Sequence, residues 1–298
     1  MIVLGSANMD IVARAEHAPA AGETVLGRDY ALYPGGKGAN QAVAARRAGA
    51  AITFIGSLGQ DAYGEALLHA LTAEAIDCGA TIRTATPTGI AIITVEAGGE
   101  NRIIVIPGAN HDLTADRLPP TMPPATILLT QLEIPIPTVL AAAARVRATG
   151  GTTILNASPI AGIDAATSTR LCAAADILLV NETEAAALLG LPRLNDTAGA
   201  AARLATGRRA AVITLGADGV AWASEQGTFA LKRHDVPVVD TTGCGDAFAG
   251  GFAGALERGA TLADAVAFGN AAGALAATKP GAQPAMPTHA EINALLST

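Results

Sequence analysis

Aromatic and charged residues are scarce in this chain. Phe, Trp and Tyr make up 3% of the 298 residues, and Asp, Glu, Lys and Arg make up 15%. Half of the residues are apolar, which excludes a disordered chain, because disordered segments combine low hydrophobicity with many charges. The formal net charge of −7, without any run of Lys or Arg, excludes a general attraction to nucleic acid. An anionic ligand therefore needs a local binding device.

Cysteine is also rare. Cys78, Cys172 and Cys244 lie far apart and form no Cys-x-x-Cys pair, so neither a disulfide framework nor a zinc site is indicated. The N-terminal MIVLGSANMD lacks a basic leader and is typical of a first strand, not of a signal peptide. The Ala-rich segment 265–277 is shorter than the roughly 18 apolar residues of a membrane span. We expect a soluble, cytoplasmic protein without membrane or nucleic-acid partners.

Short apolar runs alternate with helical stretches along most of the chain, which favours a parallel sheet covered on both faces. Two segments, 23–33 and 88–106, instead alternate apolar and polar residues, and the second contains a Gly-Gly-Glu-Asn hairpin turn. We therefore expect one α/β domain over residues 1–298, with a mainly parallel central sheet flanked by helices. A small antiparallel β lid is expected from about 11–34 and 88–107.

The strongest chemical signal is the stretch DTTGCGDAFAGG at 240–251. Residues 241–245 are expected to present backbone N–H groups near the start of a helix that begins at Ala247, and such a terminus attracts anions. Glycines there let the backbone approach phosphate oxygens closely. Asp246 repels phosphate, so we expect it to face a second substrate and to accept the proton of an attacking hydroxyl. An ordinary helix start with a helpful acid explains this stretch alone equally well.

A second glycine-rich turn, YPGGKGANQAVAA, precedes another predicted helix. Its glycines let a ligand approach the backbone, and Lys37 and Asn40 offer hydrogen bonds. The turn is not a Walker A loop, because Ala31 stands where the first glycine of that motif falls.

Polar residues also follow apolar strands elsewhere. Asn8 and Asp10 point to the same side of an extended chain and can clamp vicinal hydroxyls, although a plain turn is the simpler interpretation. Asn181 and Glu184, in NETE, either hold a hydrated Mg²⁺ or cap a helix. Glu133 is either a site residue or a solvated loop acid. Together these loops supply a phosphate cradle, a carboxylate, hydroxyl-binding groups and a metal helper, which indicates phosphoryl transfer to an alcohol.

In order and over nearly the whole chain, the motifs GSANMD, GGKGANQAVAA, LLTQLE, NETE and DTTGCGDAFAGG resemble those of the ribokinase/PfkB carbohydrate-kinase family. The resemblance implies a three-layer ribokinase-like fold whose β lid often pairs two subunits, and hence a homodimer. It implies an ATP-dependent kinase that phosphorylates D-ribose at O5, with Mg²⁺ and usually K⁺ as cofactors.

The resemblance also assigns roles to single residues. Asp246 matches the catalytic base, and Gly243, Cys244 and Gly245 match the anion hole. Besides Asp246, sugar contacts are implied for Asn8, Asp10, Gly36, Lys37, Asn40 and Glu133. Nucleotide contacts are implied for Asn181, Glu184, Thr214, Gly216, Gly245 and Asn270, and Glu184 is also associated with Mg²⁺ through water. A monovalent cation is implied between Asp240, Thr242, Ala276, Lys279 and Gly281.

Two departures from the family's pattern stand out. Cys244 replaces a common Ala and places a thiol at a helix start, where its pKa can be lowered. LNASP at 155–159 replaces the usual LNPAP, without an evident consequence.

Rival functions remain at this point. Related kinases act on 2-deoxyribose, nucleosides or fructose, but Asn8 and Asp10 together with GGKGANQ favour ribose. A non-catalytic sugar-binding sensor is disfavoured because Asp246 and its glycines are present. A nicotinamide-dependent dehydrogenase is disfavoured because the dinucleotide-binding motif Gly-x-Gly-x-x-Gly is missing. After the first strand only Gly5 is present, and the later Gly-x-Gly at 243–245 is followed by Phe248 where the third glycine of the motif should stand.

Overall fold

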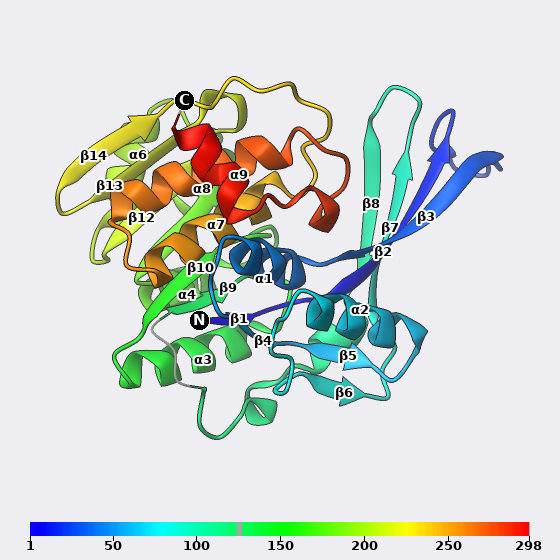
Figure 1. Cartoon of the computed structure of the whole chain (residues 1–298), viewed down its shortest axis with the longest axis horizontal. Coiled ribbons are helices and arrows are strands. Elements are labelled where there is room, and N and C mark those ends of the chain that lie inside the picture. Colours follow the sequence, from blue (N-terminus) through cyan, green and yellow to red (C-terminus); the bar gives the residue numbers. More distant parts are fainter. Residues whose placement is uncertain (124–126, 298) are drawn as a thin grey trace.

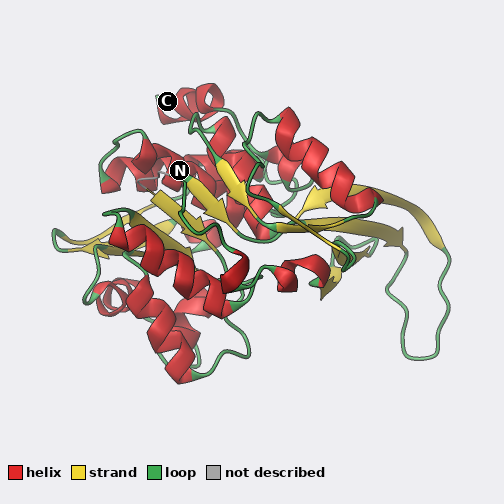
Figure 2. Cartoon of the chain, turned by 90° about the horizontal axis from the view of Figure 1, so that it is seen from below, coloured by secondary structure: helices red, strands yellow, loops and turns green. Residues whose placement is uncertain are grey.

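The computed structural model describes residues 1–123 and 127–297 and is built around a central sheet between two layers of helices (Figure 1, Figure 2). The strands of this sheet are β1 (Ile2–Leu4), β4 (Thr53–Ile55), β9 (Ile127–Thr130), β10 (Thr152–Asn156), β11 (Ile177–Asn181), β12 (Ala210–Thr214), β13 (Val220–Ser224) and β14 (Gly227–Leu231). Their order is β14-β13-β12-β11-β10-β9-β1-β4. The six neighbouring strands β12, β11, β10, β9, β1 and β4 run parallel, and β13 and β14 add an antiparallel edge. The predicted mainly parallel sheet is confirmed.

Both faces of the sheet are buried, because its parallel strands are apolar at consecutive positions. Val3 and Leu129 face one core, whereas Leu4 and Leu128 face the other, as the alternation of side chains along a strand requires. The first core is covered by α1 (Lys37–Arg47), α2 (Ala62–Ala73), α7 (Cys244–Glu257), α8 (Leu262–Ala276) and α9 (His289–Leu296). The second is covered by α3 (Ile136–Ala148), α4 (Ala165–Ala174), α5 (Glu182–Leu188) and α6 (Thr197–Ala205).

Small residues let α1 and α7 approach each other closely. A Cβ on Gly250 of α7 would lie 2.6 Å from the carbonyl oxygen of Gln41 in α1, so only glycine fits there. This contact brings together the starts of the two helices that follow the glycine-rich motifs. Throughout the described part of the chain, no helix combines the length and apolar character needed to cross a bilayer.

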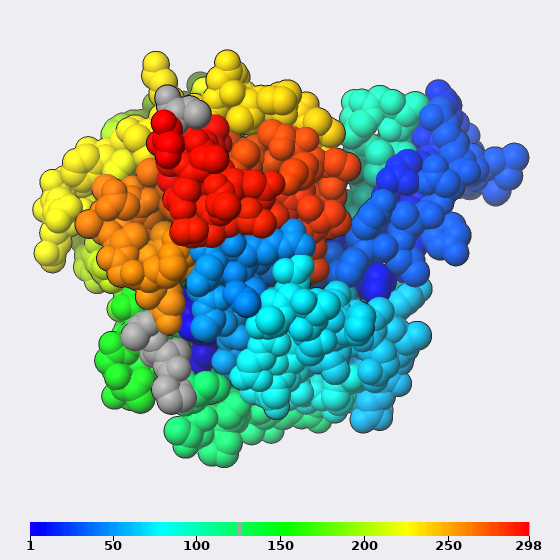
Figure 3. Space-filling model, in the orientation of Figure 1, coloured from blue at the N-terminus to red at the C-terminus, as the bar shows by residue number. Residues whose placement is uncertain are grey.

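A second sheet projects from the main body (Figure 1, Figure 3). It consists of β2 (Asn8–Ala15), β3 (Gly27–Gly35), β7 (Gly89–Val95) and β8 (Asn101–Ile106) in the order β3-β2-β7-β8. The hairpin turn expected before Asn101 closes between Glu96 N and Glu100 O at 2.9 Å. The sheet is mixed, not purely antiparallel as predicted, because the first strands of the two hairpins, β2 and β7, pair in parallel. It also begins at Asn8, three residues before the expected boundary.

A short parallel pair, β5 (Ser57–Gly59) and β6 (Ile82–Thr84), was not predicted as a separate sheet. Beside it, the short 3₁₀ segment Gly108–Asp112 follows β8 and returns the chain toward the start of β2.

Candidate active site

Asp246 lies in the first turn of α7, at the centre of the site. The helix begins at Cys244, three residues earlier than predicted, because Gly243 adopts the left-handed conformation (φ 75°, ψ 0°) and forms the N-cap. Ala247 N donates to Gly243 O at 2.8 Å, so the N–H groups that precede it have no acceptor within the helix. Asp246 is therefore part of the helix, and its side chain is 7% exposed.

Two side-chain amides from α1 hold the Asp246 carboxylate. Asn40 Nδ2 donates to Oδ2 at 3.0 Å, and Gln41 Nε2 donates to Oδ1 at 2.9 Å. The sequence pointed to Asn40 but not to Gln41. The one signal for Gln41 was a polar side chain beside Asn40, in a stretch of small apolar residues that the structure buries.

The predicted anion hole is only partly open. A Cβ on Gly245 would meet no atom within 4 Å, so its backbone faces free space. Cys244 N, by contrast, donates to Thr241 O at 3.2 Å and is not available in this structure. The expectation of a lowered pKa for the Cys244 thiol is wrong: burial raises this pKa to about 11, and the charges of Asp240 and Asp246 add to the effect.

Asn8 and Asp10 lie two residues apart on β2, so they do share one side of a strand and do not form a turn. Asn110 Nδ2 donates to Asn8 Oδ1 at 2.7 Å, a contact that sequence reasoning missed because the two residues are far apart in the chain. The neighbouring strand accommodates Asp10 with a glycine, since a Cβ on Gly35 would overlap the Asp10 carboxylate.

Asp10, Glu133 and Asp246 share one electrostatic environment. Burial first, and then the negative charges of Glu133 and Asp246, raise the pKa of Asp10 to about 7. Lys37 is the compensating cation: Asp246 raises the pKa of its ammonium group, burial opposes this, and Glu133 and Glu184 add to the increase.

Glu133 links the loop after β1 to the start of α1 by hydrogen bonds. Its Oε2 accepts hydrogen bonds from Ser6 Oγ at 2.5 Å and from Lys37 N at 3.1 Å. Gly36, just before the helix, has φ 87°, and a Cβ there would lie 2.7 Å from Asn8 N. The six residues predicted to contact a sugar therefore gather beside Asp246, so Glu133 is a residue of this cluster and not a solvated loop acid.

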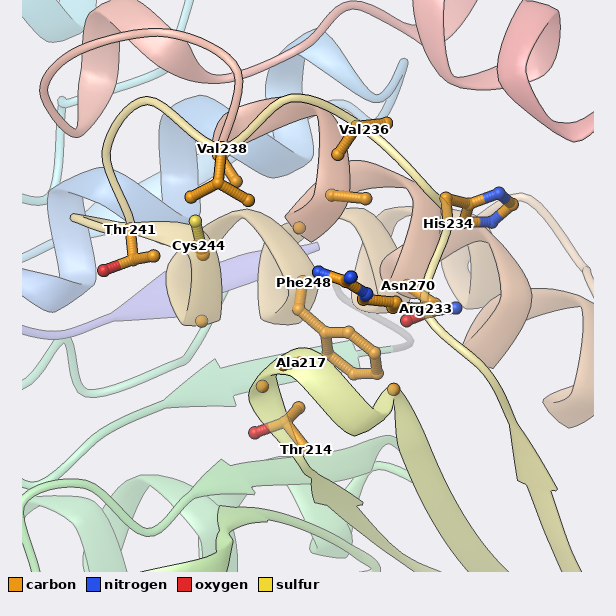
Figure 4. Close-up of a pocket in the computed structure, with 16 residues that line it drawn as sticks. Thr214, Ala217, Arg233, His234, Val236, Val238, Thr241, Cys244, Phe248 and Asn270 are labelled. Atoms are coloured by element: carbon orange, nitrogen blue, oxygen red, sulfur yellow. The ribbon is translucent and has the colours of Figure 1, made fainter.

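A pocket of about 420 Å³ opens beside Gly245 (Figure 4). Four of the six predicted nucleotide residues, Thr214, Gly216, Gly245 and Asn270, line it, and most of its lining is apolar. The amide of Asn270 also supports the chain after β14, because its Nδ2 donates to Lys232 O at 2.8 Å.

The segment after β14 forms one wall of this pocket. It contributes Arg233, His234, Val236 and Val238 (Figure 4). None of these was predicted from the sequence as a site residue, because the segment matches no binding motif, and the region from Val236 that continues the strand pattern in the sequence forms no strand in the structure.

Asn181 and Glu184 do not line this pocket. They form a reciprocal capping box at the start of α5: Asn181 N donates to Glu184 Oε2, and Glu184 N donates to Asn181 Oδ1, both at 2.9 Å. The helix-cap interpretation therefore describes their contacts, while Glu184 Oε1 stays outside the box. In residues 1–123 and 127–297, no three His, Cys, Asp or Glu side chains lie close enough together to hold a metal ion.

The loop before α7 is attached to the loop after α8 through Asp240. Its carboxylate accepts from Thr242 N at 2.9 Å and from Gly281 N at 2.8 Å, while its own N–H donates to Ala277 O at 3.2 Å. Burial alone would raise the pKa of Asp240, but these two N–H donors outweigh it and hold that pKa below its ordinary value.

The other two residues of the predicted cation set lie at the end of α8. Ala276 O accepts the backbone N–H of Lys279 at 3.3 Å. The Lys279 ammonium forms an ion pair with Glu291, with 2.9 Å between Nζ and Oε1.

Known proteins share this fold over their full length. A structure of ribokinase from Thermotoga maritima superposes with a TM-score of 0.92 at 35% identity, covering 100% of this chain and 99% of that one. Arabidopsis thaliana ribokinase, solved with ribose and ATP, superposes with a TM-score of 0.89 at 31% identity, covering 100% and 98%.

Sequence relatives agree with the structural ones. Ribokinase of Bacillus subtilis is 37% identical over 300 residues, covering 99% of this chain and 98% of the relative, and that of Staphylococcus aureus is 36% identical over 302 residues, covering 98% of both. The family model described as pfkB family carbohydrate kinase matches residues 1–289. The chain belongs to the pfkB family of carbohydrate kinases.

Proposed function

We propose that this protein is an ATP-dependent kinase that transfers the γ-phosphoryl group of ATP to O5 of D-ribose. The observation that carries the proposal is the position of Asp246. Its carboxylate accepts a hydrogen bond from Asn40, its charge raises the pKa of Asp10, and it follows Gly245, whose backbone faces free space. A base at this junction can meet a sugar hydroxyl while the helix N-terminus attracts phosphate.

The sugar pocket consists of Asn8, Asp10, Lys37 and Asn40, with Glu133 at its edge. Carboxylate and amide oxygens accept hydrogen bonds from vicinal hydroxyls, and the amide and ammonium groups donate to the ring and hydroxyl oxygens. The similarity to ribokinases extends over the full length of the chain, and the Arabidopsis enzyme was solved with ribose. Both observations support D-ribose as the substrate, ahead of 2-deoxyribose, fructose or a nucleoside.

The reaction is an in-line displacement. The O5 hydroxyl attacks the γ-phosphorus, its proton passes to Asp246, and the bond to the β-phosphate oxygen breaks to release ADP. The protein acts mainly by positioning and charge stabilisation, because such transition states are loose. The Gly245 N–H and the dipole of α7 stabilise the charge on the transferred group, and Lys37 balances the acidic cluster.

ATP is proposed to occupy the pocket along Thr214, Gly216 and Asn270, with its phosphates toward Gly245. The described residues lack a three-ligand metal cluster, which fits a Mg²⁺ ion carried by the nucleotide phosphates and contacted through water by Glu184. Bound there, Mg²⁺ would neutralise phosphate charge.

A monovalent cation, K⁺ above all, fits the loops attached through Asp240. The oxygens of Asp240, together with the backbone carbonyls of Thr242, Ala276, Lys279 and Gly281, are hard donors of the kind that such ions prefer. The Lys279 side chain does not compete, because its ammonium pairs with Glu291. An ion there would stiffen the loop that leads into α7.

The small sheet is proposed to act as a lid over the sugar and as a dimer contact. Every residue of β8 is exposed, including Ile103, Ile104, Val105 and Ile106, and a solvent-facing apolar strand of this kind needs cover. A second copy of the same sheet would supply it. The three cysteines are free, which fits a reducing cytoplasm.

The proposal is tested by comparing kcat/KM for D-ribose, 2-deoxyribose, fructose and adenosine, with ATP, Mg²⁺ and K⁺ present. A clear preference for D-ribose supports the proposal. Preference for another acceptor keeps the phosphoryl transfer and reassigns the sugar pocket. Binding of ribose without any turnover would contradict the kinase and favour a sensor.

A further inference from the structure

Gln41 is a buried amide that contacts Asp246 but reaches no solvent. Its exposed fraction is 0%, as is that of Gln131 at the end of β9. A side chain without accessible surface does not touch the sugar or the nucleotide. Any influence of Gln41 on the reaction must therefore pass through the side chains that it contacts.

The orientation of the Gln41 amide is set by a neighbour on each side. Gln131 Nε2 donates to Gln41 Oε1 at 2.6 Å, so this oxygen is the acceptor. The donor end is then directed at Asp246 Oδ1, 2.9 Å away, and at Asn156 Oδ1, 3.1 Å away. Because an amide oxygen only accepts and an amide nitrogen only donates, the chain from Gln131 to Asp246 has one consistent direction.

The second amide on Asp246 is different. Asn40 donates to Oδ2, but its own Oδ1 is buried without a hydrogen-bond partner in the described structure. A buried acceptor left unpaired is costly. Asn40 keeps 6% of its surface exposed and one end of its amide unpaired, so its hydrogen bond to Asp246 Oδ2 can be exchanged for one from a sugar hydroxyl, whereas both ends of Gln41 are already occupied.

We propose that Gln41, oriented by Gln131, is a positioning residue that fixes the Asp246 carboxylate so that Oδ2 faces the attacking hydroxyl. The inference rests on the proposed function, and its test separates the two.

The main variant is Gln41→Met, which removes the donor and keeps the length of the side chain. The expected result is a fall in kcat of about 10- to 100-fold, the usual scale for misplacing a reacting group. The KM values for ribose and ATP should stay nearly unchanged. The kcat is expressed per ADP-binding site, counted by calorimetric titration, so that misfolded protein does not contribute to the fall.

Thr138→Val is the matched control. Thr138 is 0% exposed and its hydroxyl donates to Leu113 O at 2.6 Å on the opposite face of the sheet. This variant should lose stability but keep kcat per ADP-binding site. An unchanged kcat per ADP-binding site in Gln41→Met, or a loss no different from that of Thr138→Val, would overturn the inference.

If Gln41→Met does not fold, Gln131→Met tests the same chain of amides, with a smaller fall in kcat per ADP-binding site expected. An unchanged kcat there would overturn the role of the chain. If the unmodified protein phosphorylates no sugar, the proposed function has failed. Crystal structures then decide the positioning role, because a rotated Asp246 carboxylate in Gln41→Met supports it and an unchanged one refutes it.

Discussion

Asn40 Nδ2 donates to Asp246 Oδ2 at 3.0 Å, although the two residues are 206 positions apart in the chain. The contact exists because α1 and α7 pack with almost no side chain between them at Gly250. Each helix begins at one of the two glycine-rich motifs. Their packing turns two separate signals into one site, with an amide from the first motif on the carboxylate of the second.

Replacing Asp246 by Asn should abolish most of the activity without unfolding the protein. The amide keeps the size of the side chain but accepts no proton from the sugar hydroxyl, so we expect kcat to fall by about 100- to 10,000-fold. Steady-state kinetics with ribose measure the loss, and calorimetric titration with ADP checks that the nucleotide still binds. Activity within a few-fold of the unmodified protein would show that Asp246 is not the base.

Gly245→Ala should separate stability from activity. The new methyl group meets no protein atom within 4 Å and lies in a helix, so the free energy of unfolding should stay equal or rise by up to about 1 kcal/mol. The same methyl group enters the pocket where phosphates are proposed to lie, so kcat/KM for ATP should fall. Gly98→Ala is the control, because its nearest neighbour would be Glu100 Oε2 at 3.5 Å in a turn of the small sheet. Unchanged ATP kinetics in Gly245→Ala would contradict this placement of the phosphates.

The raised pKa of Asp10 should make the protein less stable as pH rises from about 4 to about 7. The ordinary pKa of 3.8 applies in the unfolded chain, so the carboxyl ionises there first while the folded protein still holds its proton. Below pH 4 the penalty is absent, and above pH 7 it is complete. Urea unfolding at several pH values, compared with Asp10→Asn, isolates this effect. Equal pH slopes for the two proteins would be inconsistent with a raised pKa.

The apolar strand β8 should mediate dimer formation. Ile104 is 63% exposed, and Ile104→Glu places a charge on that strand, so we expect a dimer for the unmodified protein and a monomer for the variant. Light scattering at working concentration measures both. Leu191→Glu, at an exposed position of 38% beyond α5, is the control and should stay dimeric. A monomeric unmodified protein, or a dimeric Ile104→Glu, would argue against this interface.

Asp240 should carry a dependence of the activity on K⁺. We expect higher kcat in K⁺ than in Na⁺, and Asp240→Asn should lose most of this difference, because the carboxylate that joins the two loops is gone. Lys279→Ala should keep the difference, since the Lys279 ammonium pairs with Glu291. Rates measured in the two salts at equal ionic strength test this. A K⁺ effect that survives in Asp240→Asn but disappears in Lys279→Ala would reverse the assignment.

Local patterns in the sequence were sufficient for the main architecture. The parallel sheet follows from consecutive apolar residues, such as those of β9 and β11, which can be buried only between two layers of helices. The small sheet follows from alternation and from the turn before Asn101. Its parallel β2–β7 pair did not follow, because alternation shows which face of a strand is buried but not which strand lies next to it.

For the site, the sequence by itself determined which residues sit where the backbone turns from strand to helix, and hence the candidates Asp246, Asn40 and Lys37. Only the tertiary structure decided which side chains meet, such as the amide of Gln41 on Asp246 and that of Asn110 on Asn8. It also decided that the segment after β14 forms a wall of the pocket proposed for ATP and that the Cys244 thiol has a raised pKa. The reason is physical: glycines and helix starts are encoded by neighbours in the chain, whereas burial and hydrogen-bond partners depend on residues that only folding brings together.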